Sequence, residues 1–447
     1  MASMPEPSAP LAGDALPAPR ARPSRRLPRH PLALWAAFAL VHTVLVLLCL
    51  HAPGWPLGDV EGVYKVWVGE AAGGGSQVGI DLPWVYPILA YPPMALANLL
   101  GPELYAQTWL GLVVALNAAA FAVLTGGLRA RRARPPWRLT AAWWWLAFLL
   151  LLGPIALARI DAVTVPLAIV GLLLAAGRPA LGVALLTVGA WVKVWPAALV
   201  AALFVVARSR ARVVQSALGV SAVVVLVSVI LGGGAYVLGF VGEQTGRGLQ
   251  IEAPIGTPWL WLTALGAAGT GIYYDFDILT YQLLGEGTAL AGTLATPLMA
   301  LAAASVVLLG VLRQRAGAHV VQLLPPLALA LVLVFIVFNK VGSPQFMTWL
   351  AAPVILGLVY RGRQWLTPAV LAFAFAGLTQ LIYPYLYGAL LAAEPWMVLV
   401  ITLRNLLEVV LLGWAVRAVH RAGRAPASAP DRRALNPSSH NRRALNP

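Results

Sequence analysis

The sequence predicts an all-α polytopic membrane protein with about 12 transmembrane helices, some of them short half-spanning ones. The first observation is composition, because 60% of the 447 residues are hydrophobic and only 11% are charged, against roughly 25% in a soluble domain. The second is that apolar runs recur as far as residue 417 without a gap of soluble-domain length. The third is that the cations gather between these runs, as the positive-inside rule expects.

The net charge of +15 is explained by topology. The basic clusters lie at 20–29, 129–138, 208–212, 313–315, 361–363 and 417–443. The positive-inside rule places all of these in the cytoplasm, together with both chain termini. We therefore expect a lipid bilayer as partner and no nucleic acid.

The apolar runs define the expected helices. Ten of them are expected at about 31–52, 103–127, 139–157, 161–177, 213–232, 289–312, 319–338, 345–360, 365–382 and 396–417. The stretch 181–207 has Arg178 before it and Arg208 after it, so both of its ends should face the cytoplasm. Because proline lacks an amide hydrogen, Pro196 predicts a break near Lys193 and two half-spanning helices.

Three regions follow from this topology. Residues 1–30 are rich in Pro, Ala and Arg and are expected to be a disordered cytoplasmic N-terminus. Residues 31–418 form one polytopic membrane domain, which we take to be catalytic, with outer-face segments at 53–101 and 233–287. Residues 419–447, in which RRALNP occurs twice, form a disordered cytoplasmic tail.

Asp59 is the leading candidate for a catalytic residue. It lies in GDVEGVY, directly after the first apolar run, where a carboxylate is costly unless something there uses it. The aromatic faces of Tyr64 and Trp67 suit a sugar or the lipid interface. The alternative is structural, with Asp59 acting as the N-cap of an interfacial helix that starts at Val60.

Several cations lie where the orientation bias does not expect them. The topology places five at the outer face: Lys65, Arg159, Lys193, Arg247 and Lys340. Cations on that side oppose the bias and so suggest an anionic ligand, for which a phosphate is the natural candidate. Four of them, Lys193, Arg159, Lys340 and Arg247, are candidate ligands of a donor phosphate.

Local pairing offers competing explanations. Arg159 can pair with Asp161 across a tight turn, and Arg404 can pair with Glu408 one turn later in the last helix. Near Lys340, in NKVGSPQF, the amide of Gln345 can hydrogen-bond a hydroxyl. Gln345 and Trp195 join Tyr64 and Trp67 as candidate sugar-binding or acceptor-binding residues.

Other chemistries find little support in the sequence. Cys49 is the only cysteine, which excludes an intrachain disulfide and a cysteine-based metal site. The six histidines have no zinc spacing, and no phosphate-binding loop or dinucleotide fingerprint occurs in a supporting context. We therefore predict neither a metal nor a cofactor. Binding of a divalent metal by Asp59 with Glu61 or Asp81 stays open as a weaker alternative.

Five segments carry a family resemblance. GDVEGVY, RIDAVTVP, GAWVKVWP, RGLQIEAP and NKVGSPQF, in this order, resemble the GT-C glycosyltransferases. More narrowly, they resemble the actinobacterial polyprenyl-phosphate-mannose-dependent α-mannosyltransferases, over about 31–417. Within that family the chain looks most like the members that add an α-1,2-linked mannose to phosphatidylinositol mannosides.

The resemblance implies an activity and a location. It implies that Asp59 is the catalytic base, that polyprenyl-phosphate-mannose is the donor and that a phosphatidylinositol mannoside is the acceptor. The active site would then lie on the periplasmic or extracellular side of the plasma membrane. Two other hypotheses stay open: a secondary transporter of an anionic solute using Lys193, Arg404 and Glu408, and a related transferase that uses another lipid-linked sugar such as arabinose.

Overall fold

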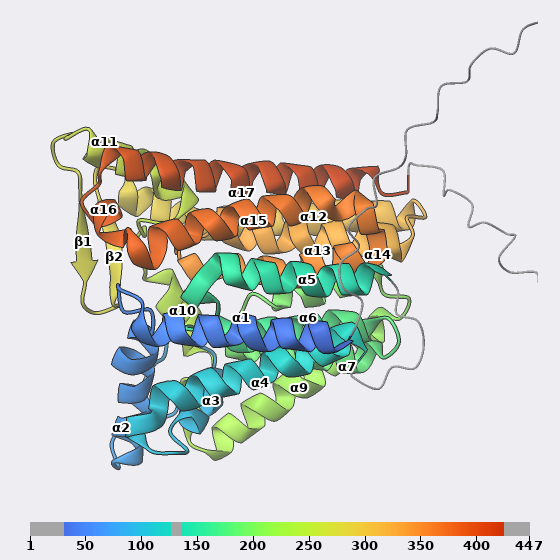
Figure 1. Cartoon of the computed structure of the whole chain (residues 1–447), viewed down its shortest axis with the longest axis horizontal. Helices are drawn as coiled ribbons and strands as arrows, with labels where there is room; N and C mark the ends of the chain where they lie inside the picture. The colour runs from blue at the N-terminus through green and yellow to red at the C-terminus, as the bar shows by residue number, and fades with distance from the viewer. Residues whose placement is uncertain (1–30, 127–135, 424–447) are drawn as a thin grey trace, which may run out of the picture.

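The computed structural model describes residues 31–126 and 136–423, and helices account for most of them. Figure 1 shows long helices side by side, with short helices and a β-hairpin gathered at one end of the molecule. This confirms the predicted all-α polytopic fold. The predicted disorder of 1–30 and 424–447, and most of the basic cluster at 129–138, lie outside the described residues.

Eight stretches of the described chain are long and apolar enough to cross a membrane. Seven of them correspond to α1 (Pro31–His51), α4 (Tyr105–Thr125), α5 (Pro136–Leu152), α9 (Arg210–Ile230), α12 (Thr288–Arg315), α13 (Val320–Val337) and α17 (Pro395–Arg421). Because α17 continues to Arg421, the membrane domain extends three residues past the predicted boundary at 418.

The eighth stretch, Pro344–Tyr385, reverses direction and contains two helices, α14 (Ala351–Arg361) and α15 (Leu366–Gln380). Gly362, at the turn, packs against Trp137 at the beginning of α5. At the other end of α5, Gly153 packs against Gln380, where α15 ends. Both α14 and α15 lie along α5, so the chain turns back at Gly362, as predicted.

Four shorter apolar helical stretches are also present among the described residues: Ile88–Ala97, α6 (Asp161–Ala175), α7 (Pro179–Val192) and α8 (Ala197–Val206). The chain breaks between α7 and α8, where Lys193 is extended with φ −151° and ψ 131°. At about 1.5 Å per residue, each of the two helices is shorter than the roughly 30 Å of a bilayer core. The predicted pair of half-spanning helices around Lys193 is therefore confirmed, and every predicted helix has a counterpart.

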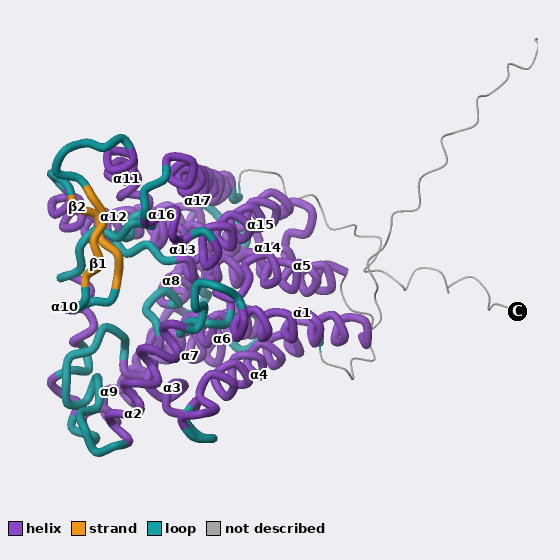
Figure 2. Tube along the Cα trace, turned by 60° about the vertical axis from the view of Figure 1, so that its left-hand side comes forward, coloured by secondary structure: helices purple, strands orange, loops and turns teal. Residues whose placement is uncertain are grey.

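The two predicted outer-face segments contain short elements that lie at one end of the bundle (Figures 1 and 2). They include a π-helix (Val60–Tyr64), α2 (Lys65–Ala72), α3 (Tyr91–Ala97), α10 (Gly239–Thr245) and α11 (Thr257–Ala264), and α16 (Tyr387–Leu391) lies beside them. A small apolar cluster of Leu249, Leu260, Met397 and Ile401 joins the second segment to α17.

A β-hairpin in the second segment was not predicted. Strands β1 (Gly271–Asp275) and β2 (Thr280–Leu284) are antiparallel, with Tyr273 opposite Gln282. The turn is closed by Asp275, whose Oδ1 accepts hydrogen bonds from the backbone amides of Asp277 at 3.0 Å and Ile278 at 3.3 Å. Figure 2 shows the hairpin close to α10 and α11, at the same end of the bundle.

Candidate active site

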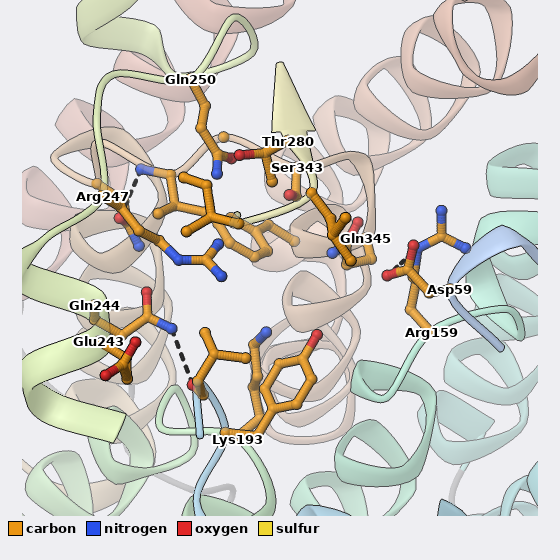
Figure 3. A pocket seen from close by; sticks show the side chains of 18 of the residues that line it. Asp59, Arg159, Lys193, Glu243, Gln244, Arg247, Gln250, Thr280, Ser343 and Gln345 are labelled. Carbon is orange, nitrogen blue, oxygen red and sulfur yellow. Dashed lines mark hydrogen bonds and ion pairs between the residues drawn. The ribbon is translucent and has the colours of Figure 1, made fainter. Parts of the chain in front are cut away.

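A cavity of about 670 Å³ opens among the short elements at this end of the bundle. All nine candidate site residues of the sequence analysis line it: Asp59, Tyr64, Trp67, Arg159, Lys193, Trp195, Arg247, Lys340 and Gln345. They come from segments that are far apart in the chain. The structure therefore brings every candidate to one place, and the roles assigned to them stay predictions. Figure 3 shows how the polar side chains surround the cavity.

Asp59 forms an ion pair with Arg159, whose Nε lies 3.1 Å from Oδ2. The carboxylate side chain keeps 36% of its surface exposed toward the cavity, whereas the arginine side chain keeps 8%. The N-cap alternative is wrong, because Asp59 makes no capping hydrogen bond and its backbone is already helical. Its side chain is thus held by a cation at the cavity wall.

Arg159 is held firmly in this position. Its Nη1 donates to the carbonyl oxygens of Pro56 at 2.6 Å and Ala158 at 2.7 Å, and its Nη2 donates to the Tyr383 hydroxyl at 2.8 Å. Burial lowers the pKa of Arg159, but the charge of Asp59 and the Tyr383 hydroxyl outweigh that effect and raise it. The guanidinium stays charged and has little hydrogen-bonding capacity left for another ligand.

The expected pairing of Arg159 with Asp161 is wrong, because Asp161 has other partners. Its Oδ1 accepts a 2.6 Å hydrogen bond from the Trp349 indole, and its Oδ2 lies 4.0 Å from Lys193 Nζ. Arg159 lies two residues before Asp161, the first residue of α6, so the two side chains point in different directions and reach different neighbours.

Lys193 reaches the cavity from the break between α7 and α8. Its Nζ lies 4.6 Å from the centre of the Tyr86 ring, which adds a cation–π contact to the long ion pair with Asp161. Trp195 is 1% exposed, donates to the Thr164 hydroxyl at 2.9 Å and stacks on Trp349. Trp195 therefore supports the wall around Lys193 and offers little surface for stacking a sugar.

Arg247 and Lys340 also line the cavity, and Figure 3 shows Arg247 across the cavity from Asp59. Burial lowers the pKa of Lys340, and the nearby charge of Arg247 lowers it further. Burial also lowers the pKa of Arg247, although Tyr86 and Glu243 partly compensate. Arg247 Nε is buried without a hydrogen-bond partner. Two like charges in a poorly solvated place favour the binding of an anion between them.

The two loops that carry these cations touch through their backbones. The Gln250 amide donates to the Lys340 carbonyl oxygen at 3.0 Å, and Gly342 packs directly on the backbone of Glu252 and Ala253. No space remains for a Cβ at position 342, so the glycine sets the spacing between RGLQIEAP and NKVGSPQF.

Gly342→Ala is therefore expected to destabilise the protein by about 1–3 kcal/mol, the usual cost of overpacking, and to separate Arg247 from Lys340. Thermal unfolding of the purified protein measures the effect. Gly69→Ala in α2 is the matched control, since an added Cβ there meets nothing within 4 Å. The control should be neutral or gain up to about 1 kcal/mol from helix propensity. Equal melting temperatures for both variants would contradict the close loop packing.

An aromatic wall faces the cavity next to Asp59. Trp67 and Trp84 meet edge to face at 5.5 Å, and Tyr86 meets Trp84 in the same way at 5.5 Å. Tyr64 is buried, and its hydroxyl accepts a 3.3 Å hydrogen bond from the Ile160 amide, so it supports the Arg159 turn. Trp67 stays partly exposed and offers the better surface for a sugar.

Sequence reasoning missed several polar residues of the cavity. Glu243 and Gln244 on α10 line it, and Gln244 Nε2 donates to the Val85 carbonyl oxygen at 3.1 Å, which joins the two outer-face segments. Tyr383 and Tyr387 also line it. The signal for these tyrosines was the aromatic run LIYPYLY at 381–387, which continues past the end of the helix expected at 365–382.

Arg404 lies just behind the cavity and joins two carboxylates. Its Nη1 is 2.7 Å from Glu252 Oε2 and its Nε is 3.5 Å from Glu408 Oε1. The predicted pair with Glu408 is confirmed, whereas the shorter contact with Glu252 was not foreseen. All three side chains are almost fully buried. Only Glu252 reaches the cavity wall, so Arg404 and Glu408 do not line a path for a solute there.

Metal ligands do not converge in this region. Among the described residues, no group of three or more His, Cys, Asp or Glu side chains could hold a metal ion. The two alternative partners of Asp59 in a metal site are engaged elsewhere, since Glu61 accepts a hydrogen bond from the Trp55 indole and Asp81 accepts one from the Gln77 backbone amide.

Comparison with known proteins gives one finding. The model of glycosyltransferase family 87 matches residues 84–269, a segment that contains Arg159, Asp161, Lys193, Arg247 and Glu252. Searches of the curated proteins and of the solved structures found no match. The family match, together with the many apolar helices around a polar cavity, supports a membrane glycosyltransferase.

Proposed function

We propose that this protein is an inverting α-mannosyltransferase that uses polyprenyl-phosphate-mannose. The acceptor is a mannose hydroxyl of a phosphatidylinositol mannoside, and the new bond is an α-1,2 linkage. The observation that carries the proposal is the cavity itself, which Asp59 lines together with the cations Lys193, Arg247 and Lys340. A base and an anion site at opposite sides of one space suit transfer from a phosphate donor.

The reaction follows from these positions. Asp59 takes the proton of the acceptor hydroxyl as the oxygen attacks the anomeric carbon of the donor from the face opposite the phosphate. The bond between that carbon and the phosphate oxygen breaks, and its electron pair leaves with polyprenyl phosphate. Attack from the opposite face converts a β-linked donor into an α-linked product.

The cations divide into two roles. Lys193, Arg247 and Lys340 stabilise the departing phosphate by charge-assisted hydrogen bonds. Arg159 was a candidate for this role, but its guanidinium is occupied by Asp59, Tyr383 and two carbonyl oxygens. We therefore assign Arg159 to the orientation of the Asp59 carboxylate.

The location follows from the charge distribution. The cavity lies at the bundle end that carries the short elements, and the basic clusters of α12, α14 and α17 lie at their other ends. Under the positive-inside rule the basic end faces the cytoplasm, and this charge distribution supports a cavity at the outer face of the plasma membrane.

Sugar transfer in detergent tests the proposal. The purified protein is given polyprenyl-phosphate-mannose and a phosphatidylinositol mannoside, and the product is examined by mass spectrometry and linkage analysis. The expected product carries one more hexose in an α-1,2 linkage. Transfer of arabinose alone from a lipid-linked donor would reject mannose, and solute counterflow in proteoliposomes without any transfer would reject the enzyme.

Lys193→Met is expected to lower kcat by about 10² to 10³-fold, as for the removal of one donor at a developing negative charge. Steady-state sugar transfer measures it. Lys65→Met is the matched control, because Lys65 lies in the same outer-face segment as Asp59 but does not line the cavity. It should retain near-normal turnover.

Loss of Lys193 also leaves Asp161 without its cation, so a folding defect has to be separated from a catalytic one. The double variant Lys193→Met with Asp161→Asn removes both charges, while the introduced amide oxygen can still accept the hydrogen bond from Trp349. The double variant should fold normally and stay as slow as the single variant. Recovery of turnover in it would contradict a direct role for Lys193.

A further inference from the structure

A second cavity, of about 540 Å³, lies between α12 and α17, away from the candidate active site. Its lining is Leu309, Val409, Leu412, Gly413, Val416, Arg417 and His420, none of which lines the first cavity. Gly413 faces open space, since an added Cβ there would meet nothing within 4 Å. The groove is apolar over most of its length and ends in two polar side chains.

The polar end of this groove is strongly basic. Arg313, in the last turn of α12, donates from Nη2 to Nδ1 of His420 at 3.1 Å. Its own Nε is buried without a hydrogen-bond partner. Arg315 and Arg421 follow in the last turns of α12 and α17. In the described part of the chain, no carboxylate forms an ion pair with any arginine of this group.

Helix length places this basic end at the depth of lipid headgroups. α12 has 28 residues and α17 has 27, so each is about 40 Å long at roughly 1.5 Å per residue. A bilayer core is about 30 Å thick, so the last turns extend beyond it. The apolar part of the groove then lies among acyl chains and the arginines lie beside phosphates.

We propose that this groove binds an anionic phospholipid, with an acyl chain along Leu309, Leu412 and Val416. The headgroup phosphate lies against Arg417 and His420, with Arg313 behind them. The charge decides between lipid classes. A zwitterionic headgroup carries a cation of its own, whereas an anionic one meets arginines that form no ion pair with a carboxylate of the described chain. The proposal does not depend on the reaction at the other end of the molecule.

Native mass spectrometry of the full chain in detergent tests the charge preference. The probes are dioleoyl phosphatidylglycerol and dioleoyl phosphatidylcholine, which have the same acyl chains. Phosphatidylglycerol is expected to bind several-fold more tightly. Arg417→Gln should weaken phosphatidylglycerol binding about five-fold, which corresponds to roughly 1 kcal/mol per cation near the surface. The double variant with Arg313→Gln should weaken it about 25-fold in total. Arg212→Gln is the matched control at the beginning of α9 and should change nothing.

A second variant tests whether the lipid occupies the groove. Gly413→Leu fills the groove but keeps every cation, so binding of both lipids should fall. Gly219→Leu in α9 is its control, because an added Cβ at Gly219 also meets nothing within 4 Å, and it should bind both lipids normally. Equal affinity for the two lipids, or unchanged phosphatidylglycerol binding by Gly413→Leu, would overturn the proposal. The proposal would also be overturned if the protein formed a dimer that Gly413→Leu dissociates and Gly219→Leu does not, with lipid binding unchanged.

Discussion

Asp59→Asn is expected to lower the turnover of sugar transfer by about 10² to 10⁴-fold, the usual contribution of a general base. Asparagine has nearly the same shape and keeps an oxygen that can lie next to Arg159 Nε, so the wall of the cavity should keep its geometry. What is lost is the ability to take a proton from the acceptor hydroxyl. Single-turnover and steady-state rates of the purified protein in detergent measure the effect.

A neighbouring carboxylate provides the control for this prediction. Glu61 lies two residues after Asp59, accepts a 3.0 Å hydrogen bond from the Trp55 indole and does not line the cavity. Glu61→Gln removes the same charge from the same segment and should retain near-normal turnover. Normal turnover in Asp59→Asn, or an equal loss in Glu61→Gln, would reject Asp59 as the base.

The sequence predicted the helices well because their signals are local. Apolar length sets each span, and Pro196 sets the break that brings Lys193 to the cavity. The Arg404–Glu408 pair was predictable for the same reason, since residues four apart share one face of a helix. In each case the sequence separation itself fixes the geometry.

The partners of the charged residues were harder to predict. Asp59 and Arg159 are 100 positions apart, and Arg404 and Glu252 are 152 apart, so no periodicity links them. Sequence proximity even gave a wrong partner for Arg159, because Asp161 was nearer along the chain. The orientation bias was a better guide than sequence proximity, since four of the five cations that it singles out line the cavity and Lys65 does not. That they bind a phosphate stays a prediction.

The hairpin and the tyrosines near the cavity were missed for other reasons. Two short runs, GIYYD and TYQLL, are rich in aromatic and β-branched residues and flank a turn. This pattern indicates a β-hairpin, but it is too short to show in a reading based on apolar length. Tyr383 directly follows the helix expected at 365–382, and hydropathy gives no indication of which residues a side chain at that position contacts.

Arg404→Met is expected to destabilise the protein by about 3–5 kcal/mol, the usual cost of breaking a buried ion pair. Glu252 and Glu408 would both remain buried, without the guanidinium that holds them at 2.7 Å and 3.5 Å. The free energy of unfolding in detergent, from denaturant titration, measures the change. Arg363→Met, which removes an exposed arginine, should stay within about 0.5 kcal/mol of the wild type.

The origin of that cost can be separated from simple loss of packing. Adding Glu252→Gln and Glu408→Gln to Arg404→Met removes both orphaned charges while keeping the shapes of the side chains, so most of the stability should return. If the triple variant were as unstable as Arg404→Met alone, the arginine would matter through its contacts with Asn405 and the Glu252 carbonyl oxygen instead of its charge.

Because Glu252 also lines the cavity, the same comparison shows whether α17 holds the Arg247 loop in place through this ion pair. Sugar transfer by the triple variant should then remain below normal even where its stability is restored.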